Sequence, residues 1–220
     1  MTKPITATAA MQLYEQGKFH MDDPIHRFIP EFMDLTVLHD NGEQVPVKNH
    51  MTMQQLLSHT TGLSYGFDPQ NDPVDKLYVE ARLWDHKDLD SFLKTVSKLP
   101  LKFEPGSAWH YSIALDVTGA VIERISGQSF DEYLKEHIFD PLCMDDTFFQ
   151  LPAEKKSRLL PNNYWDPEKN KLVAMDTKML VQTEALLAGA SEQSAMFNFD
   201  EVSLYSGGGG LISTAMDYLK

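Results

Sequence analysis

Residues 1–17 read MTKPITATAAMQLYEQG, and the rest of the chain can be placed around them. Apolar residues recur in this stretch at helical spacing, which predicts an amphipathic helix that buries Met11 and Leu13 among others. Gly17 stands where a glycine that ends a helix is expected. Lys3 falls in the first turn, where a reactive group lies close to the positive end of the helix dipole. The chain therefore opens on a helix that carries an amine at its N-terminus.

Further helices are predicted by local start and stop signals. Thr52 and Gln55 form a capping-box pattern, as do Ser129 and Glu132. Between these two patterns, residues 114–126 give the clearest amphipathic helix in the chain, and glycine follows it directly. Other helices are expected over residues 25–29 and 89–99 and, after the glycine run 207–210, from Ser213 or Thr214 onward.

Strand signals are short. Residues 36–38 and 45–47 flank Asp-Asn-Gly, a strong turn signal, and predict a hairpin. Residues 147–149 and 172–175 also have strand-like composition, with a turn before the second. Residues 64–75 are rich in Gly, Pro, Asn and Asp, so a surface loop is expected there. Residues 179–199 are apolar without a clear period, and no element is assigned to them. The pattern favours an α+β protein with more helix than sheet.

Composition excludes several classes of protein. The chain has 220 residues with 42% hydrophobic side chains, enough for one domain or two small ones. Its net charge of −13, with scattered Lys and Arg, argues against a nucleic-acid partner. No apolar run of membrane-spanning length occurs. The lone Cys143 excludes an intrachain disulfide and is interpreted as a small core residue.

Few residues carry chemistry by their pattern alone. Lys3 is either a desolvated base or a solvated terminal lysine, and the second reading is favoured without further information. Tyr111, between Pro105-Gly106 and a strong helix, is either a phenolic acid or base or a core aromatic residue. Ser58 and His59 are adjacent and would not face each other on a helix, so His59 is expected to be a hydrogen-bonding helix terminus. No metal or cofactor site is predicted, since the eight histidines show no ligand spacing.

Several segments in order resemble the β-lactamase-related serine hydrolases, the family of serine β-lactamases, penicillin-binding DD-peptidases and carboxylesterases of the same fold. The segments are Leu56-Leu57-Ser58-His59-Thr60-Thr61-Gly62-Leu63, Phe103-Glu104-Pro105-Gly106 with Trp109-His110-Tyr111-Ser112, Ile122-Glu123-Arg124-Ile125-Ser126-Gly127, Ile138 to Thr147, and Gly207 to Thr214. Together they span most of the chain. The resemblance implies that residues 1–220 are a partial domain of this family, with an α+β, β-lactamase/DD-peptidase-like fold that is mostly the helical domain with remnants of the antiparallel sheet.

The resemblance also implies roles for individual residues. Met1 to Pro4 match part of a Ser-x-x-Lys motif, so the nucleophilic serine is expected one residue before Met1 and Lys3 becomes its base. Tyr111 would relay a proton to the leaving group. Trp109, Ser112 and Ile113 are expected at the substrate pocket. Ile113 replaces the asparagine that the family commonly has, which fits esters or other acyl substrates better than β-lactams.

The function expected from the resemblance is that of a serine hydrolase acting on an ester or amide carbonyl through an acyl-serine intermediate. The chain resembles a form truncated at both ends, which is expected to be inactive by itself. A non-catalytic ligand-binding or regulatory module that keeps the fold is the alternative. The expected partner is a small-molecule ester, amide or β-lactam-like substrate. The sequence assigns no compartment and no oligomeric state.

Overall fold

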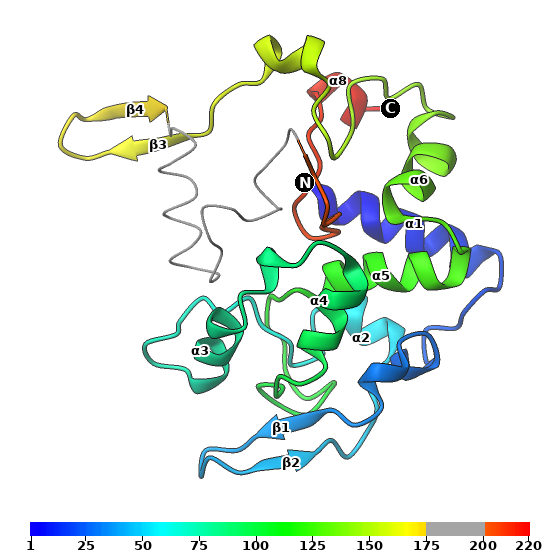
Figure 1. The fold of residues 1–220 in the computed structure, drawn as a ribbon, viewed down its shortest axis with the longest axis vertical. Coiled ribbons are helices and arrows are strands. Elements are labelled where there is room, and N and C mark those ends of the chain that lie inside the picture. Colours follow the sequence, from blue (N-terminus) through cyan, green and yellow to red (C-terminus); the bar gives the residue numbers. More distant parts are fainter. Residues whose placement is uncertain (175–200) are drawn as a thin grey trace.

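The computed structural model describes residues 1–174 and 201–220. Figure 1 shows a mainly helical molecule, with a small β-hairpin at the lower end and another at the upper left. The helices are α1 (Thr2–Glu15), α2 (Met53–Leu57), α3 (Pro73–Glu80), α4 (Leu89–Val96), α5 (Ala114–Ser126), α6 (Phe130–Leu134) and α8 (Ala215–Tyr218). Shorter helical turns are η1 (Ile25–Arg27), η2 (Pro30–Phe32), η3 (Leu83–Asp85), η4 (Lys135–Phe139, a π-helical turn) and η5 (Ala153–Arg158).

Helix α5 lies at the centre of the fold and packs against α1, α2, α4 and α6. Its residues from Ala114 to Ile122 are all buried, and burying each large apolar side chain contributes about 1.5–3 kcal/mol. Gly127 ends the helix in the left-handed region at φ +73°, as its position in the sequence predicts. The predicted core helix is confirmed, and it forms the platform for the N-terminal helix.

Helix α1 is confirmed, although one of its predicted core residues is not in the core. Ala9 and Leu13 are buried, whereas Met11 is 37% exposed. Met11 lies two positions from Leu13, so on a helix the two side chains point to opposite faces. Gly17 adopts φ +68° and its N–H donates to the carbonyl of Tyr14, which closes the helix.

Only one of the two predicted capping boxes forms. Thr52 accepts from the backbone N–H of Gln55, and the Gln55 side chain accepts from the Thr52 N–H in return. Ser129 makes no capping hydrogen bond at the start of α6. The carboxylate of Glu123 instead accepts from the N–H of Phe130 at 2.8 Å. The prediction for Ser129 was wrong because a side chain from the preceding helix takes this role.

The sheets are small and antiparallel. β1 (Thr36–Leu38) pairs with β2 (Gln44–Pro46), which confirms the predicted hairpin. β3 (Asn163–Asp166) pairs with β4 (Lys171–Ala174), so the first strand of this hairpin is 163–166. Residues 147–149 were predicted as a strand but contribute a single bridge, from Phe148 to Ile212. The unassigned stretch 179–199, and the end of the predicted strand at Met175, lie outside the described residues.

Two predictions of burial are corrected. The stretch 64–75 is not simply a surface loop, because Ser64 and Asp75 are fully or almost fully buried and α3 begins within it. Cys143 is exposed rather than part of the core. It follows the π-helical turn η4 at φ +52°, in a tight turn where its N–H donates to Asp140. The turn carries Cys143 out of the packed face.

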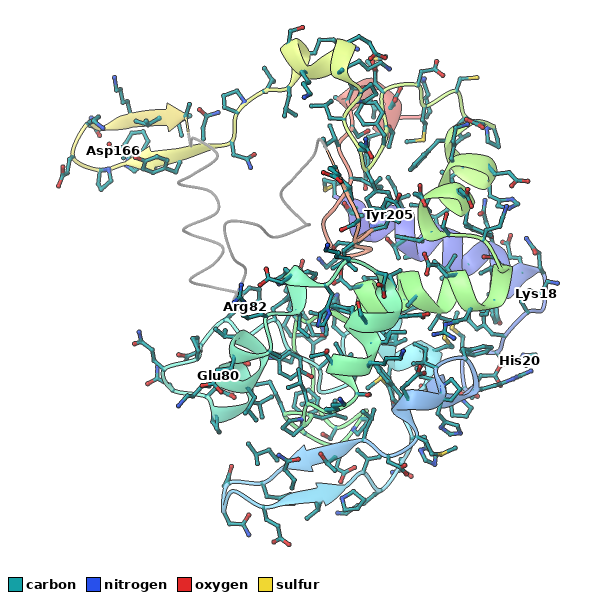
Figure 2. All side chains as sticks on the ribbon, in the orientation of Figure 1. Lys18, His20, Glu80, Arg82, Asp166 and Tyr205 are labelled. Carbon is teal, nitrogen blue, oxygen red and sulfur yellow. The ribbon has the colours of Figure 1, made fainter. Side chains whose placement is uncertain are left out.

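The C-terminal segment runs beside the N-terminus. Figure 1 shows this segment in red crossing the start of α1 before it ends at α8. Thr214 caps α8, which settles the choice between Ser213 and Thr214, by accepting from the N–H of Asp217. In Figure 2, Asp166 lies out on the β3–β4 hairpin, whereas Lys18 and His20 lie at the far end of α1. Among the described residues, no helix is long and apolar enough to cross a membrane.

Candidate active site

Lys3 projects from the first turn of α1 into a cluster of polar and aromatic groups. Its Nζ donates to the carbonyl of Gly208 at 2.6 Å. The same Nζ lies 4.7 Å from the ring centroid of Tyr111 and 5.3 Å from that of Tyr65. Cation–π attraction acts within about 6 Å of a ring centroid, so both rings hold the amine. The structure therefore places Lys3 and Tyr111, which the sequence singled out, side by side.

The glycine run that holds Lys3 has no space for side chains. A Cβ on Gly207 would overlap the carbonyl oxygen of Leu115, and one on Gly208 would overlap both the carboxylate of Asp116 and the hydroxyl of Tyr65. Glycine is required at these positions because the backbone packs too closely for any side chain. As a result, the backbone of Gly207 and Gly208 lies directly against the start of α5, and the Gly208 carbonyl accepts from Lys3.

The two phenols next to Lys3 differ in what their hydroxyls do. The Tyr65 hydroxyl donates to Asp116 Oδ2 at 3.1 Å, and burial together with this carboxylate raises the pKa of Tyr65 strongly. Tyr111 is 38% exposed, and within the described part of the chain no hydrogen bond is formed by its hydroxyl. Tyr65 thus donates its hydroxyl to Asp116, whereas the Tyr111 hydroxyl has no partner among residues 1–174 and 201–220 and its ring lies beside the amine.

His59 holds the loop that carries Tyr111. Its Nδ1 accepts from the backbone N–H of Ser112 at 3.2 Å, and its carbonyl accepts from the N–H of His110. The His59 ring also lies 4.9 Å from the Tyr111 ring. Burial, with further contributions from the charges of Lys3 and His110, lowers the pKa of His59 to about 4. At neutral pH the imidazole is therefore an uncharged acceptor, which confirms the expected hydrogen-bonding role at the end of α2.

The three residues predicted at the substrate pocket lie in different environments. Trp109 is 66% exposed and packs edge-on against His59, so its ring is open to a ligand. Ser112 and Ile113 are fully buried. Ser112 Oγ lies 3.4 Å from His59 Nδ1, and Ile113 belongs to the hydrophobic core. The replacement of asparagine by isoleucine at position 113 thus places an apolar side chain in the core.

Sequence reasoning missed Tyr65, Asp116 and Gly208 as members of the site. Asp116 is 1% exposed and accepts from Ser206, Gly208 and Tyr65, which come from two other segments of the chain. The local sequence assigns Asp116 no role, since it lies on a helix that has the pattern of an ordinary core helix. The one available signal was an acidic residue at a position surrounded by apolar ones in α5.

The site contains the elements of acid–base chemistry but no metal cluster. The Lys3 amine and the Tyr111 ring lie in contact, and the exposed Trp109 is two residues from Tyr111 in the chain. Within residues 1–174 and 201–220, no group of three or more His, Cys, Asp or Glu is arranged to hold a metal ion. A hollow of about 370 Å³ lies elsewhere, between η5 and the C-terminal segment, and neither Lys3 nor Tyr111 lines it. The chemistry of the Lys3 cluster, rather than cavity size, makes it the candidate active site.

Comparison with known proteins agrees with the resemblance seen in the sequence. Esterase EstB of Burkholderia gladioli is 34% identical over 224 residues, covering 100% of this chain and 54% of the esterase. Lovastatin esterase of Penicillium rubens is 32% identical over 174 residues, covering 76% of this chain and 43% of the esterase. The chain spans about half the length of the curated relatives it matches.

A solved structure confirms the predicted fold class. The structure of EstCE1, described as a hydrolase with promiscuous acyltransferase activity, superposes with a TM-score of 0.75 at 27% identity, covering 99% of this chain and 55% of that one. The expected helix-rich fold with small antiparallel sheets is therefore confirmed. The family model named Beta-lactamase matches residues 1–220. With a match over its whole length, this chain belongs to the Beta-lactamase family.

Proposed function

We propose that this chain supplies the base and the proton relay of a serine hydrolase that cleaves small-molecule esters through an acyl-serine intermediate. The contact between Lys3 Nζ and the Tyr111 ring, at 4.7 Å, is the observation that carries the proposal. It brings an amine at a helix N-terminus next to a phenol whose hydroxyl is unpartnered within the described part of the chain. The relatives named as esterases support an ester substrate over a β-lactam.

The nucleophile in this proposal is a serine at the position immediately before Met1. That serine would stand one helical turn from Lys3, on the same face of α1. The Lys3 amine takes the hydroxyl proton as the serine oxygen attacks the ester carbonyl, and the helix N-terminus favours the developing negative charge. When the tetrahedral intermediate collapses, Tyr111 passes a proton to the departing alcohol. Water then attacks the acyl-serine and releases the acid.

The 220-residue chain alone is proposed to be inactive. The two threonine hydroxyls on the same part of α1 are already engaged in the structure. Thr2 Oγ1 accepts from the N–H of Leu211 at 3.1 Å, and Thr6 Oγ1 donates to the carbonyl of Gly207 at 2.7 Å. Both hydroxyls thus connect α1 to the C-terminal segment, and the proposal gives neither of them the role of nucleophile.

The pocket in this proposal is defined by Trp109 rather than by its buried neighbours. The exposed indole offers an apolar face for the acyl or alcohol part of the substrate. Ser112 and Ile113 are assigned a positioning role, because Ser112 is bonded to His59 and Ile113 precedes α5 as its N-cap residue. Replacing Trp109 by Ala is expected to raise KM with a smaller effect on kcat.

The test uses a version of the chain that is extended at both ends and carries a serine immediately before Met1. A fluorophosphonate is expected to form a covalent adduct on that serine, and the 220-residue chain is expected to form none. Lys3→Ala and Tyr111→Phe are each expected to lower kcat about 10²–10⁴-fold toward a chromogenic ester, the usual contribution of a general acid or base.

Matched controls exist for both substitutions. Tyr14 is as exposed as Tyr111, and Lys18 is an exposed lysine beyond the far end of α1. Tyr14→Phe and Lys18→Ala should leave kcat unchanged. A folded protein that binds the ester without forming an adduct would disprove the catalytic proposal and identify a binding module instead. Faster turnover of a cephalosporin than of the ester would overturn the choice of substrate.

A further inference from the structure

Asp116 is a buried carboxylate that the proposed reaction does not use directly. It is 1% exposed, and burial raises its pKa, opposed by hydrogen bonds from Ser206, Gly208 and Tyr65 and by the charge of Lys3. A buried carboxylate is costly unless donors satisfy its oxygens. Here Oδ1 accepts from Ser206 Oγ at 2.5 Å and from the Gly208 N–H at 2.9 Å, and Oδ2 accepts from the Tyr65 hydroxyl at 3.1 Å. All three donors are uncharged.

Two of these three donors lead directly to Lys3. The Gly208 N–H donates to Asp116 Oδ1 at 2.9 Å, and the Gly208 carbonyl accepts from Lys3 Nζ at 2.6 Å. Tyr65 gives its hydroxyl to Asp116 while its ring lies 5.3 Å from the same Nζ. Asp116 therefore fixes both a hydrogen-bond acceptor and an aromatic face that contact the amine.

The third donor closes the loop that carries the Gly208 carbonyl. Ser206 Oγ donates to Asp116 and accepts from the N–H of Gly209 at 3.0 Å, and the Ser206 carbonyl accepts from the N–H of Gly210. This turn is thus folded around the carboxylate. Without the carboxylate, Gly208 would lose the contact that sets the direction of its carbonyl.

We propose that Asp116 is a positioning residue that holds the Lys3 amine in its reactive place through Gly208 and Tyr65. The inference rests on the proposed function and names a residue beyond the base and the relay. A role in packing alone would be served by an apolar residue at this point of α5, where the neighbours on the helix are core side chains. Unlike an apolar side chain, the carboxylate accepts hydrogen bonds from two separate segments, Tyr65 in one and Ser206 and Gly208 in the other.

The chain offers a matched control in Asp75. This carboxylate is 2% exposed and accepts from Ser64, the Asp68 N–H and Lys102. None of its bonds reaches Lys3. Asp75→Asn therefore reports the effect of removing a buried carboxylate that lies outside the amine's contacts.

The first experiment works on the 220-residue chain and needs no catalysis. Lysines are labelled with acetic anhydride at low excess, and the rate at Lys3 is compared with that at Lys18 by peptide mass spectrometry. Asp116→Asn is expected to raise the Lys3 rate relative to Lys18, and to speed hydrogen exchange at the Gly208 amide by about tenfold or more, the loss of one hydrogen bond to a charged group. Asp75→Asn should change neither the labelling rate of Lys3 relative to Lys18 nor the exchange rate of the Gly208 amide.

The second experiment uses the same extended version, with a serine placed before Met1. Asp116→Asn is expected to lower kcat about 10–100-fold with KM nearly unchanged, because the amine is displaced while the substrate pocket stays intact. If the extended version proves inactive, the labelling result still decides the positioning role, so the two proposals fail separately.

Clear outcomes would overturn the inference. A folded Asp116→Asn protein with unchanged Lys3 labelling and unchanged Gly208 exchange excludes a positioning role. If Asp116→Asn does not fold, Tyr65→Phe replaces it, since this change removes the hydroxyl and keeps the ring. Tyr65→Phe must then raise the relative Lys3 rate, and an unchanged rate overturns the proposal.

Discussion

At the scale of single residues, Gly208 is where the candidate site tolerates least change. A Cβ there would collide with the Asp116 carboxylate and the Tyr65 hydroxyl. Gly208→Ala is expected to destabilise the protein by about 1–3 kcal/mol, the usual cost of overpacking, and to increase acylation of Lys3. Urea unfolding and lysine labelling measure the two effects. Gly17→Asn is the control, because position 17 is open and asparagine accepts its positive φ.

His59 gives a prediction about pH. In the unfolded chain this histidine has the ordinary pKa of 6.5, and in the folded protein its pKa is about 4. Between these values the unfolded state binds a proton that the folded state does not, so lowering the pH from 6.5 to 4 favours unfolding. The contribution of His59 is fully present above pH 6.5. Urea midpoints measured across pH 4–7 should rise with pH.

His59→Asn separates this effect from that of other histidines. His26 and His110 also have lowered pKa values and remain in the variant. Asparagine accepts the φ of +56° at position 59 and offers an oxygen to the Ser112 N–H. The variant should fold and show a shallower rise with pH. An identical slope in both proteins would contradict the assignment. His59→Ala should lower the free energy of unfolding by about 1–3 kcal/mol more than His59→Asn does, since the N–H of the buried Ser112 loses its acceptor.

At the scale of elements, the two capping-box sequences provide a direct comparison. Thr52→Ala removes a cap that is present in the structure and is expected to lower the free energy of unfolding by about 1 kcal/mol. Ser129→Ala removes a hydroxyl that makes no capping hydrogen bond, so it should change the free energy of unfolding by less than about 0.5 kcal/mol. Denaturant unfolding at constant m-value measures both. Equal losses would show that the serine also caps α6.

The same pair shows how far sequence patterns predicted the elements. Signals that depend on a few neighbouring residues worked, as for Thr52 and for the glycine that ends α5. The Ser129 pattern failed because Glu123 reaches across from the preceding helix, a contact set by how α5 and α6 pack. Cys143 was misplaced for a similar reason, since the turn after η4 decides which way it faces. Local propensity fixes where a helix starts, and packing decides which side chain satisfies its ends.

At the scale of the whole molecule, the two ends of the chain hold each other. Lys3 bonds to Gly208, Thr6 to Gly207, and the Tyr218 hydroxyl to the carbonyl of Met1. Removing residues 206–220 is expected to lower Tm by several degrees and to expose the amides of α1 to hydrogen exchange, because the buried groups of α1 and α5 lose their partners.

An exposed change elsewhere serves as the control for this deletion. Trp165 lies on the β3–β4 hairpin and is 57% exposed, so Trp165→Ala should leave both the Tm and the exchange of α1 unchanged. If the deletion left α1 fully protected, the closing contacts would not contribute to the stability of that helix. Circular dichroism and exchange mass spectrometry provide the two measurements.

The candidate site could be predicted from the sequence only in part. Family resemblance pointed to Lys3 and Tyr111, and the structure places them together. Asp116, Tyr65 and Gly208 could not be found, because their contacts join segments about 50 to 200 residues apart and leave no mark in local sequence. Only the tertiary structure shows that the buried Asp116 is connected to the Lys3 amine through Gly208 and Tyr65.

The bond from Lys3 to Gly208 also bears on the order of folding. The amine leaves the ribosome 205 positions ahead of its acceptor. Closing so long a loop is entropically costly, so this contact forms only once the helices between have packed. A nascent chain would thus carry an unanchored lysine while the residues between Lys3 and Gly208 are synthesised. The geometry proposed for catalysis would arise as one of the final steps of folding, and a misfolded core would leave the amine unplaced.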